Sequence, residues 1–390
     1  MIKSKRIIII DFCNYEDYPI GGYLTFAKNM MTSFENELAL VGITTNKHDP
    51  IGLWFKKEIG GIEYDYFAFA YYSKLKTKHI LPDRLVSYML VKYYFKKISR
   101  IDIPNIFVRR PEVMLSIKTY TFLNICFCFA GVENPLLISK YWYSKFIAGI
   151  FEKKFFKRLV LAKTILAAGD EYAIRGMIQR SNGIILRNKV IQFPTRISTE
   201  VFRPLNKNII REKLNISKKY TVIITTGRLS WLKGWKFMID SFSLFEKKVP
   251  ESLFYFIGDG EDLQKIEEYI VKSGLINKVI LVGRKNSIEI AEYLNASDLF
   301  IMGSYKEGWS TSLMEAIACG IPACVTNFSS AKEIILEGLN GHVIEDHNID
   351  IFVKGMIKTF NLVKPVNNEN IKAFATNRLK QDILKTWKLK

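Results

Sequence analysis

The chain is poor in the residue types that build metal sites and nucleophilic triads. Its 390 residues include only four histidines and five cysteines. The histidines do not combine with a serine or cysteine in any recognisable hydrolase pattern. The cysteines form no Cys-x-x-Cys pair and lie among apolar residues, which is typical of core packing in a reducing compartment. The sequence therefore predicts no structural metal.

Long apolar runs are also missing. The longest, near residues 122–132, contains Asn124 and is followed by Glu133-Asn134-Pro135, so it is too short to span a bilayer. The first residues are charged and lead into only four isoleucines, which is not the pattern of a signal peptide. We therefore expect a cytoplasmic protein.

Negative charge is under-represented. Lysine and arginine number 57 against 38 acidic residues, a formal net charge of +19. Two basic clusters are interleaved with aromatic residues, at residues 92–97 and 153–158. Such a surface suits the anionic inner face of the cell membrane, and it is equally consistent with ordinary solvated helix faces. No nucleic-acid-binding module is recognisable, so we expect no nucleic acid partner.

The length and apolar content indicate two domains. At 390 residues, 48% of them hydrophobic, the chain can form two full cores. The amino-terminal half opens with a buried-strand pattern at residues 6–11, and further strands are predicted at 37–44, 103–108, 164–168 and 190–193. In the second half, strands predicted at 221–226, 253–257, 279–282, 298–302 and 323–326 alternate with helical segments. This alternation predicts a parallel, doubly wound α/β sheet.

A pair of glutamates marks the first candidate site. Glu307 and Glu315 bracket a loop and helix start that follow the predicted strand at 298–302. Such junctions open at the carboxyl end of a sheet, where open α/β folds bind ligands. Ser310, Thr311 and Ser312 are candidate N-caps, and the free amides of the first helical turn favour an anion. The carboxylates can accept hydrogen bonds from sugar or ribose hydroxyls.

A second strand-turn-helix junction carries two cations. The segment from Gly227 to Gly234 follows the strand at 221–226 and contains Arg228 and Lys233. The planar guanidinium of arginine can donate paired hydrogen bonds to phosphate oxygens, and lysine adds a compact positive charge. The two glycines allow the backbone to approach a ligand closely.

Together these segments resemble a known family. The Gly-Arg-Leu…Lys-Gly segment at 227–234, Ile257-Gly258-Asp259-Gly260 and the glutamate pair are similar in order and spacing to retaining glycosyltransferases of family 4. The match spans about residues 160–345. Residues 193–204 also resemble the family's interdomain connection, although Thr195-Arg196-Ile197-Ser198 stands where Asn-Gly-Val-Asp is usual.

The resemblance implies the GT-B fold, two Rossmann-like doubly wound domains facing across a cleft. We expect an acceptor-binding domain at residues 1–203 and a nucleotide-sugar-binding domain at 204–368. The final segment, 369–390, has apolar residues at helical spacing. The resemblance implies that this helix crosses back to the first domain.

The resemblance also implies site roles and substrates. Arg228, Lys233 and Glu307 are the expected catalytic residues, acting on a nucleotide diphosphate sugar without a metal or other cofactor. Donor-binding residues are expected at Gly21, Gly22, Gly258, Arg284, Gly308, Trp309, Ser310, Thr311 and Glu315. The acceptor is expected to be a glycan or lipid-linked glycan in the assembly of bacterial surface polysaccharide.

One position departs from the family. Many relatives carry a histidine near the donor sugar, after a strand resembling residues 104–108, and here Arg109, Arg110 and Glu112 occupy that neighbourhood. Either these residues take over the role of the histidine on the acceptor or sugar side, or the acceptor differs, or the two arginines are plain surface charges. Two other functions remain open. A nucleotide-sugar epimerase or phosphorylase could share the fold, and a basic binding module would need no catalysis.

Overall fold

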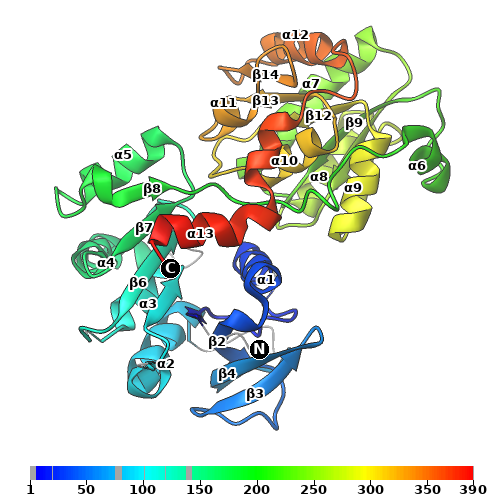
Figure 1. The fold of residues 1–390 in the computed structure, drawn as a ribbon. Helices are drawn as coiled ribbons and strands as arrows, with labels where there is room; N and C mark the ends of the chain where they lie inside the picture. Colours follow the sequence, from blue (N-terminus) through cyan, green and yellow to red (C-terminus); the bar gives the residue numbers. More distant parts are fainter. Residues whose placement is uncertain are drawn as a thin grey trace. The chain divides into compact units, whose positions relative to one another are not determined.

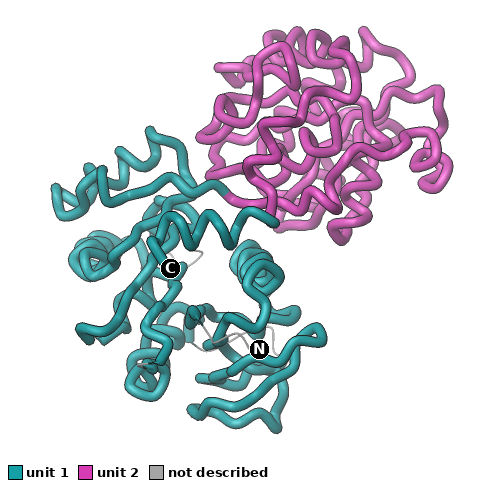
Figure 2. Tube along the Cα trace, viewed as in Figure 1, with its two compact units in different colours: residues 1–194, 377–390 teal, residues 195–376 magenta. Residues whose placement is uncertain are grey.

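The chain folds into two compact units. The computed structural model describes residues 6–19, 21–74, 81–100, 102–118, 120–137 and 143–389. Unit 1 comprises residues 1–194 and 377–390, and unit 2 comprises residues 195–376 (Figure 2). Each unit has its own sheet with helices on both faces (Figure 1). The predicted fold class, two doubly wound α/β domains, is confirmed.

Unit 1 is built on an eight-stranded sheet of order β3-β4-β2-β1-β5-β6-β7-β8. Every neighbouring pair is parallel except β3 and β4, which form an antiparallel hairpin around Gly60 and Gly61. The strands are β1 (Ile7–Ile10), β2 (Leu38–Thr44), β3 (Trp54–Ile59), β4 (Ile62–Tyr71), β5 (Asn105–Val108), β6 (Asn124–Phe129), β7 (Thr164–Ala167) and β8 (Val190–Gln192).

The four isoleucines of β1 show why this strand is central. All four are buried, and alternate residues enter different apolar clusters. Ile8 and Ile10 pack with helices α2 (Asp83–Ile98), α3 (Pro111–Ser116), α4 (Ser144–Leu159) and α5 (Glu171–Arg180). Ile7 and Ile9 pack with α1 (Gly22–Phe34) and α13 (Leu379–Trp387). Because side chains alternate across a strand, a continuous apolar run is buried on both faces of the sheet.

The last helix completes the core of unit 1. In α13, Leu379, Ile383 and Trp387 are buried in the same cluster as α1. The indole nitrogen of Trp387 donates to the side-chain oxygen of Asn124 at 3.0 Å, and Lys380 pairs with Glu37 at 2.9 Å. The helix is shorter than the predicted segment 369–390, because Glu369–Phe374 and Thr376–Arg378 form short 3₁₀ turns (η4 and η5).

Unit 2 is built on a fully parallel six-stranded sheet of order β11-β10-β9-β12-β13-β14. The strands are β9 (Thr221–Thr226), β10 (Ser252–Ile257), β11 (Val279–Gly283), β12 (Leu299–Met302), β13 (Ala323–Thr326) and β14 (Gly341–Ile344). The first five correspond to the strands predicted from the sequence.

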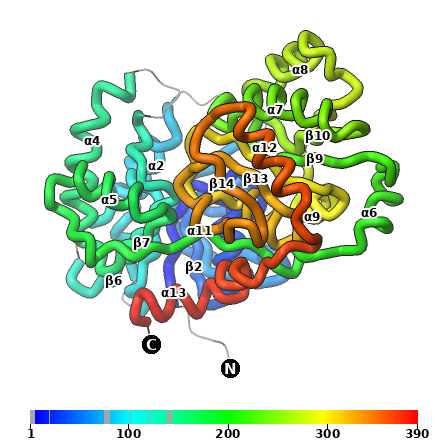
Figure 3. Tube along the Cα trace, turned by 90° about the horizontal axis from the view of Figure 1, so that it is seen from above, coloured from blue at the N-terminus to red at the C-terminus, as the bar shows by residue number. Residues whose placement is uncertain are grey.

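Helices cover both faces of this sheet. One face carries α7 (Trp235–Lys248), which lies between α8 (Leu263–Lys272) and α12 (Ile349–Phe360) (Figure 3). Val222 of β9 packs on the other face with α6 (Lys207–Lys213) and with Ala296 at the end of α9 (Ser287–Ala296). α10 (Thr311–Ala318) contacts α9, and α11 (Ala331–Ile334) follows β13. Three further 3₁₀ turns are η1 (Glu35–Glu37), η2 (Arg187–Lys189) and η3 (Trp231–Lys233). No helix in the described ranges is long and apolar enough to cross a membrane.

The unit boundaries differ from the predicted domain boundaries. The first falls at 194/195, whereas 203/204 was predicted, because Ile197 pairs with the segment near Ala375 through backbone hydrogen bonds of 3.0 and 2.8 Å. The second falls at 376/377, whereas 368/369 was predicted. Residues 369–376 stay with unit 2, where Ile371 is buried and the Asn370 amide donates to the Ile334 carbonyl at 2.8 Å.

A close backbone crossing fixes the loop after β9. Gly234 has φ +68°, and a Cβ built on it would lie 1.9 Å from the carbonyl oxygen of Gly303. A residue with a side chain would therefore push apart the loops that follow β9 and β12. Gly274 has a similar φ, +69°, but nothing lies within 4 Å of its Cβ position. A comparison of substitutions at Gly234 and Gly274 therefore separates the cost of the left-handed backbone from the cost of steric crowding.

We predict that Gly234→Ala destabilises the protein far more than Gly274→Ala. The left-handed backbone costs alanine about 1–2 kcal/mol at either site, and overpacking adds about 1–3 kcal/mol only at Gly234. Urea unfolding followed by circular dichroism measures both free energies. Equal losses for the two variants would show that the Gly234–Gly303 crossing does not constrain the fold.

Candidate active site

Three loops meet at the carboxyl edge of the unit 2 sheet. They follow β9, β10 and β11, and backbone hydrogen bonds of 2.9 Å join them, from the Gly227 amide to Ile257 and from the Gly258 amide to Gly283. A Cβ on Gly258 would lie 1.9 Å from the Gly227 carbonyl oxygen. Glycine at 258 therefore lets the two loops touch, and this contact positions Arg228 at the sheet edge.

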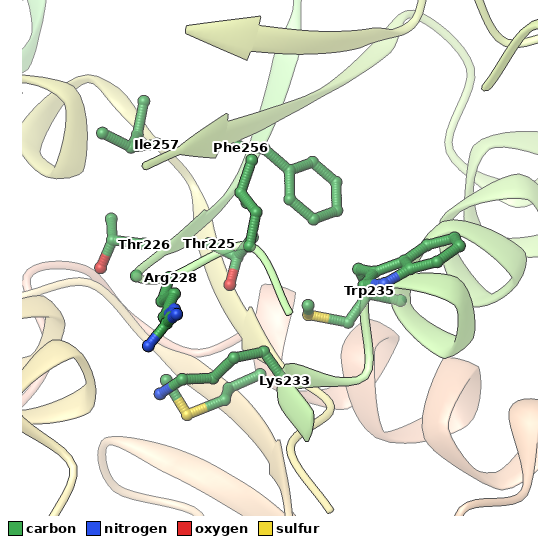
Figure 4. A pocket seen from close by; sticks show the side chains of 11 residues that line it. Thr225, Thr226, Arg228, Lys233, Trp235, Phe256 and Ile257 are labelled. Carbon is green, nitrogen blue, oxygen red and sulfur yellow. The ribbon is translucent and has the colours of Figure 1, made fainter. Parts of the chain in front are cut away.

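Arg228 and Lys233 lie beside one small cavity. In Figure 4 the nitrogen ends of both side chains turn to the same side, and Trp235 lies on the other. The cavity holds about 10 Å³, enough for about one water. It is also lined by Thr226, whose buried hydroxyl has no hydrogen-bond partner among the described residues. Two cations and a hydroxyl without a hydrogen-bond partner among the described residues thus line the same cavity.

The two cations have different partners. The Nε atom of Arg228 donates to Glu261 at 2.8 Å, and its side chain is 72% exposed. Lys233 is more enclosed and forms a short ion pair with Glu307. Lys233 and Glu307, which were predicted as site residues from separate sequence segments, therefore contact one another. The sequence analysis did not predict this contact.

Glu307 is held by a small polar network. Ser304 donates its hydroxyl to Oε1 of Glu307 at 2.9 Å, and Thr326 donates to the Ser304 carbonyl at 2.9 Å. The Glu307 side chain is 12% exposed. Ser304 and Thr326 were not predicted. Ser304 lies two residues beyond β12. Its position just after the carboxyl end of a strand is the one sequence signal that could have identified it as a site residue.

The loop leads into α10 through a capped turn. Ser310 is the N-cap, and its side chain accepts a hydrogen bond from the Leu313 amide at 3.3 Å. Its own amide donates to Ser330 at 3.0 Å. Gly308 is exposed and Thr311 is half-buried. The first turn of α10 is therefore held at the sheet edge, where its amides favour an anion.

Trp309 has a structural role that the sequence analysis missed. Its ring is 7% exposed, lies 5.4 Å from the Phe374 ring, and donates its indole N–H to the sulfur of Met314 at 3.2 Å. The side chain thus packs in the interior of unit 2. Only its backbone is left to contribute to donor binding.

Glu315 lies in α10, close to Cys319 in the helix. It is half-buried, and desolvation raises the pKa of this carboxyl to about 8. At neutral pH most molecules therefore carry it in the neutral form. A ribose with two hydroxyl donors would favour the ionised form, because a carboxylate only accepts hydrogen bonds.

Arg284 occupies a more peripheral place. It follows β11, the edge strand of the sheet, and its side chain is exposed. The adjacent Lys285 pairs with Glu289 at 3.3 Å. Arg284 thus shares the carboxyl edge with Arg228 but lies two strands away from β9.

The predicted residues of unit 1 form a second cluster. Gly22 begins α1, directly after Gly21. Arg110 forms a short ion pair with Asp11 and lies 3.5 Å from Glu112, which also pairs with Arg84 at 3.3 Å. Burial alone lowers the pKa of Arg110, but Asp11 and Glu112 raise it above its ordinary value. Arg110 and Glu112 are therefore largely satisfied by one another and by Asp11, a partner that the sequence analysis did not identify.

No metal cluster is evident in the described part of the chain, where no three histidine, cysteine, aspartate or glutamate side chains group to hold an ion. All five cysteines are buried free thiols. Metal independence remains a prediction.

Comparisons with known proteins agree with this architecture. The family described as "Glycosyl transferases group 1" matches residues 206–375. Over 175 residues the chain is 27% identical to the UDP-Gal:alpha-D-GlcNAc-diphosphoundecaprenol alpha-1,3-galactosyltransferase of Escherichia coli, covering 44% of this chain and 45% of that protein. It is 35% identical over 139 residues to the poly(glycerol-phosphate) alpha-glucosyltransferase of Bacillus subtilis, covering 35% of this chain and 20% of that protein. The match thus spans less than half of each relative's length.

Solved structures match the whole chain. Sucrose-phosphate synthase from Thermosynechococcus elongatus superposes with a TM-score of 0.73 at 13% identity, covering 99% of this chain and all of that one. HepE from Anabaena, solved in complex with UDP and glucose, gives 0.68 at 14% identity, covering 99% and 100%. At these identities the likeness shows the fold. The predicted resemblance is confirmed: the chain has the GT-B fold, and its residues 206–375 match the glycosyl transferases group 1 family.

Proposed function

We propose that this protein is a retaining glycosyltransferase that moves a sugar from a nucleotide diphosphate sugar to an acceptor hydroxyl. The observation that carries the proposal is the Lys233–Glu307 ion pair at the carboxyl edge of the unit 2 sheet, beside the first turn of α10. The relatives named above transfer galactose or glucose. These activities support sugar transfer here.

The transfer breaks the bond between the anomeric carbon and a diphosphate oxygen. A bond from the acceptor oxygen to the same carbon forms, and the hydroxyl proton leaves to the released diphosphate or to water. The leaving diphosphate gains negative charge, which Arg228 and Lys233 stabilise together with the α10 amides. We expect Lys233 to exchange its partner Glu307 for the diphosphate, which releases the Glu307 carboxylate to accept hydrogen bonds from sugar hydroxyls.

We further propose that the acceptor is a glycan or lipid-linked glycan of a bacterial surface polysaccharide, used at the inner face of the membrane. The E. coli relative's name includes a diphosphoundecaprenol acceptor, which supports this setting. Lys96 and Lys97 on α2, and Lys153 and Lys154 on α4, are exposed. The α3 helix lies between α2 and α4, so these cations share one face of unit 1.

The same face exposes apolar side chains. On α4, Phe146, Ile147 and Ile150 are 76%, 53% and 61% exposed. Their spacing of one, three and four residues places them on one side of the helix, beside its lysines. Apolar residues flanked by cations are the pattern of helices that lie on anionic membranes.

The first prediction concerns the cation that neutralises the diphosphate. Lys233→Ala should lower kcat for sugar transfer by about 10²–10³, because it removes a charge from the transition state. Mass spectrometry with a panel of nucleotide sugars and a membrane extract as acceptor measures the transfer. Lys236→Ala, at an exposed lysine three residues along, is the control.

A chelator should leave this transfer unchanged. If the chelator abolishes transfer while Lys233→Ala keeps full activity, a metal and not Lys233 stabilises the diphosphate. If the unmodified protein transfers no sugar from any donor in the panel, the proposed function is wrong and a binding module becomes the better interpretation.

The second prediction separates the two glutamates. Glu315, with its pKa raised to about 8, should bind UDP ribose only when ionised, so UDP affinity should rise about tenfold per pH unit up to pH 8 and then level off. Calorimetry from pH 6.5 to 9 tests this. Glu315→Gln should weaken UDP binding and remove its pH dependence, whereas Glu307→Gln should keep that dependence and change the discrimination between sugars. The same pH profile in both variants contradicts the assignment.

The third prediction concerns the membrane. Changing Lys96, Lys97, Lys153 and Lys154 to Glu should release the protein from anionic vesicles, since each cation near such a surface contributes about 1 kcal/mol. The matched control changes Lys218, Lys219, Lys247 and Lys248 of unit 2, which are also exposed. UDP affinity should be unaffected in both. Vesicle binding that is absent at low salt, or equal in the two variants, removes the proposed membrane face.

A further inference from the structure

Unit 2 exposes only two of its large aromatic side chains, and these two are neighbours. Among its phenylalanine, tyrosine and tryptophan residues, all of which lie in the described ranges, only Trp231 and Tyr305 are exposed, by 63% and 51%. Their ring centres lie 6.2 Å apart, and Leu232 beside them is also exposed. Single apolar side chains are common on protein surfaces, but a contiguous group of them indicates a binding surface.

The two rings lie beside the candidate active site. Trp231 and Lys233 belong to the same 3₁₀ turn, η3. Tyr305 precedes Glu307 by two residues in the loop after β12. The Tyr305 amide donates to the Leu232 carbonyl at 2.9 Å, so the segments that carry the two rings are joined next to the Lys233–Glu307 ion pair. A ligand that covers the rings would therefore lie close to this ion pair.

The Tyr305 ring is held in one orientation by its neighbours. The His347 imidazole stacks on it, with ring centres 4.2 Å apart and planes 12° apart. Nε2 of His347 donates to the Gly303 carbonyl at 3.2 Å, and the ring of the buried Phe237 lies 5.2 Å from the imidazole. A ring that is already held in place loses little conformational entropy when a ligand binds.

A pyranose ring has the chemistry that exposed aromatic rings bind. The face of an aromatic ring carries partial negative charge. The C–H groups on one face of a pyranose carry partial positive charge, so the two faces attract and exclude water between them. The sugar hydroxyls at the rim stay free to hydrogen-bond water. Glycerol phosphate offers no comparable apolar face, and its phosphate is bound best by cations.

The position of the rings favours the acceptor over the donor nucleotide. In a nucleotide sugar, the base and the sugar lie at opposite ends of the diphosphate. Glu307 is proposed to bind the donor sugar, and the acceptor hydroxyl must reach the anomeric carbon of that sugar. Because Tyr305 lies two residues from Glu307, a ligand stacked here adjoins the sugar end of the donor and not its base.

We propose that Trp231 and Tyr305 bind a pyranose ring of the acceptor. This inference rests on the proposed function and deepens it, because it makes the acceptor a sugar and gives unit 2 a part in holding it. The two aromatic side chains supply the stacking surface, and the adjoining ion pair acts on the donor.

Saturation-transfer NMR on the full chain, saturated with UDP, tests the proposal. The probes are the methyl glycosides of glucose, galactose and N-acetylglucosamine, and glycerol 3-phosphate is the comparison ligand without a pyranose face. Trp231→Leu removes the aromatic face and keeps an apolar side chain, whereas Trp231→Phe keeps an aromatic face. The matched control is Tyr172→Leu on α5 of unit 1, where the tyrosine is 87% exposed.

We expect at least one methyl glycoside, but not glycerol 3-phosphate, to bind the unmodified protein. Trp231→Leu should weaken this binding about tenfold and Trp231→Phe no more than about threefold, whereas Tyr172→Leu should leave it unchanged. In the sugar-transfer assay, Trp231→Leu should raise the acceptor KM about tenfold and leave kcat and UDP affinity unchanged. A change in KM alone is the signature of a residue that binds the acceptor.

The proposal is wrong if no methyl glycoside binds, or if Trp231→Leu and Tyr172→Leu bind it equally well. It is also wrong if Trp231→Leu weakens UDP binding, because the ring then stacks on the base. A lower urea midpoint of unfolding with unchanged glycoside binding would show instead that the ring packs within the protein.

Failure of the sugar site and failure of the proposed function give different results. Lys233-dependent transfer with an unchanged acceptor KM in Trp231→Leu would overturn the sugar site and leave the proposed function intact. Glycoside binding that depends on Trp231, without transfer from any donor, would support the sugar site and overturn the proposed function.

Discussion

Close backbone contact between glycines is the constraint on which the unit 2 site depends. Gly258 touches the carbonyl of Gly227, and Gly234 touches that of Gly303, at separations that exclude any side chain. These contacts bring the loops after β9, β10 and β12 together at one edge of a parallel sheet. Arg228, Lys233 and Glu307 are carried by those loops. Their positions therefore depend on these backbone contacts as well as on the ion pairs that the charged groups form.

The charges of the site balance one another in the absence of ligand. Lys233 pairs with Glu307, and Arg228 pairs with Glu261. Glu315 avoids an unpaired charge in another way, because desolvation raises its pKa to about 8 and holds it mostly neutral. A buried charge without a partner is costly, so each group is compensated by other groups of the protein or by a shifted pKa, and a bound ligand would replace this compensation. Arg109 in unit 1 is the contrasting case, a buried cation for which the described residues provide no carboxylate and whose guanidinium carbon lies 3.9 Å from the centre of the Phe26 ring.

The sequence predicted the parallel sheet of unit 2 well, because its strands are short apolar runs between clear helix signals. It missed the β3-β4 hairpin, where Lys56, Lys57 and Glu58 interrupt the apolar pattern at the sheet edge. It also left β6 unassigned, since this strand lies inside the longest apolar run, residues 122–132, which is longer than the strand and has no two-residue period. The sequence also missed two long-range contacts. Lys233 and Glu307 are 74 residues apart in the chain, and Trp309 and Phe374 are 65 residues apart. No local sequence pattern predicts contacts between side chains so far apart in the chain.

The position of α13 has a consequence for how the chain is made. Unit 2 is inserted between two parts of unit 1, so the apolar cluster that includes Ile7, Ile9 and Phe34 stays open until Trp387 has been synthesised. Unit 2, which is continuous, has all of its residues available before then. Domains generally fold as units during synthesis, from the amino terminus onward. Here β1 is made before unit 2, but the face of the sheet that carries Ile7 and Ile9 is fully covered only after α13 has been made, so removing Leu379–Trp387 would expose that face.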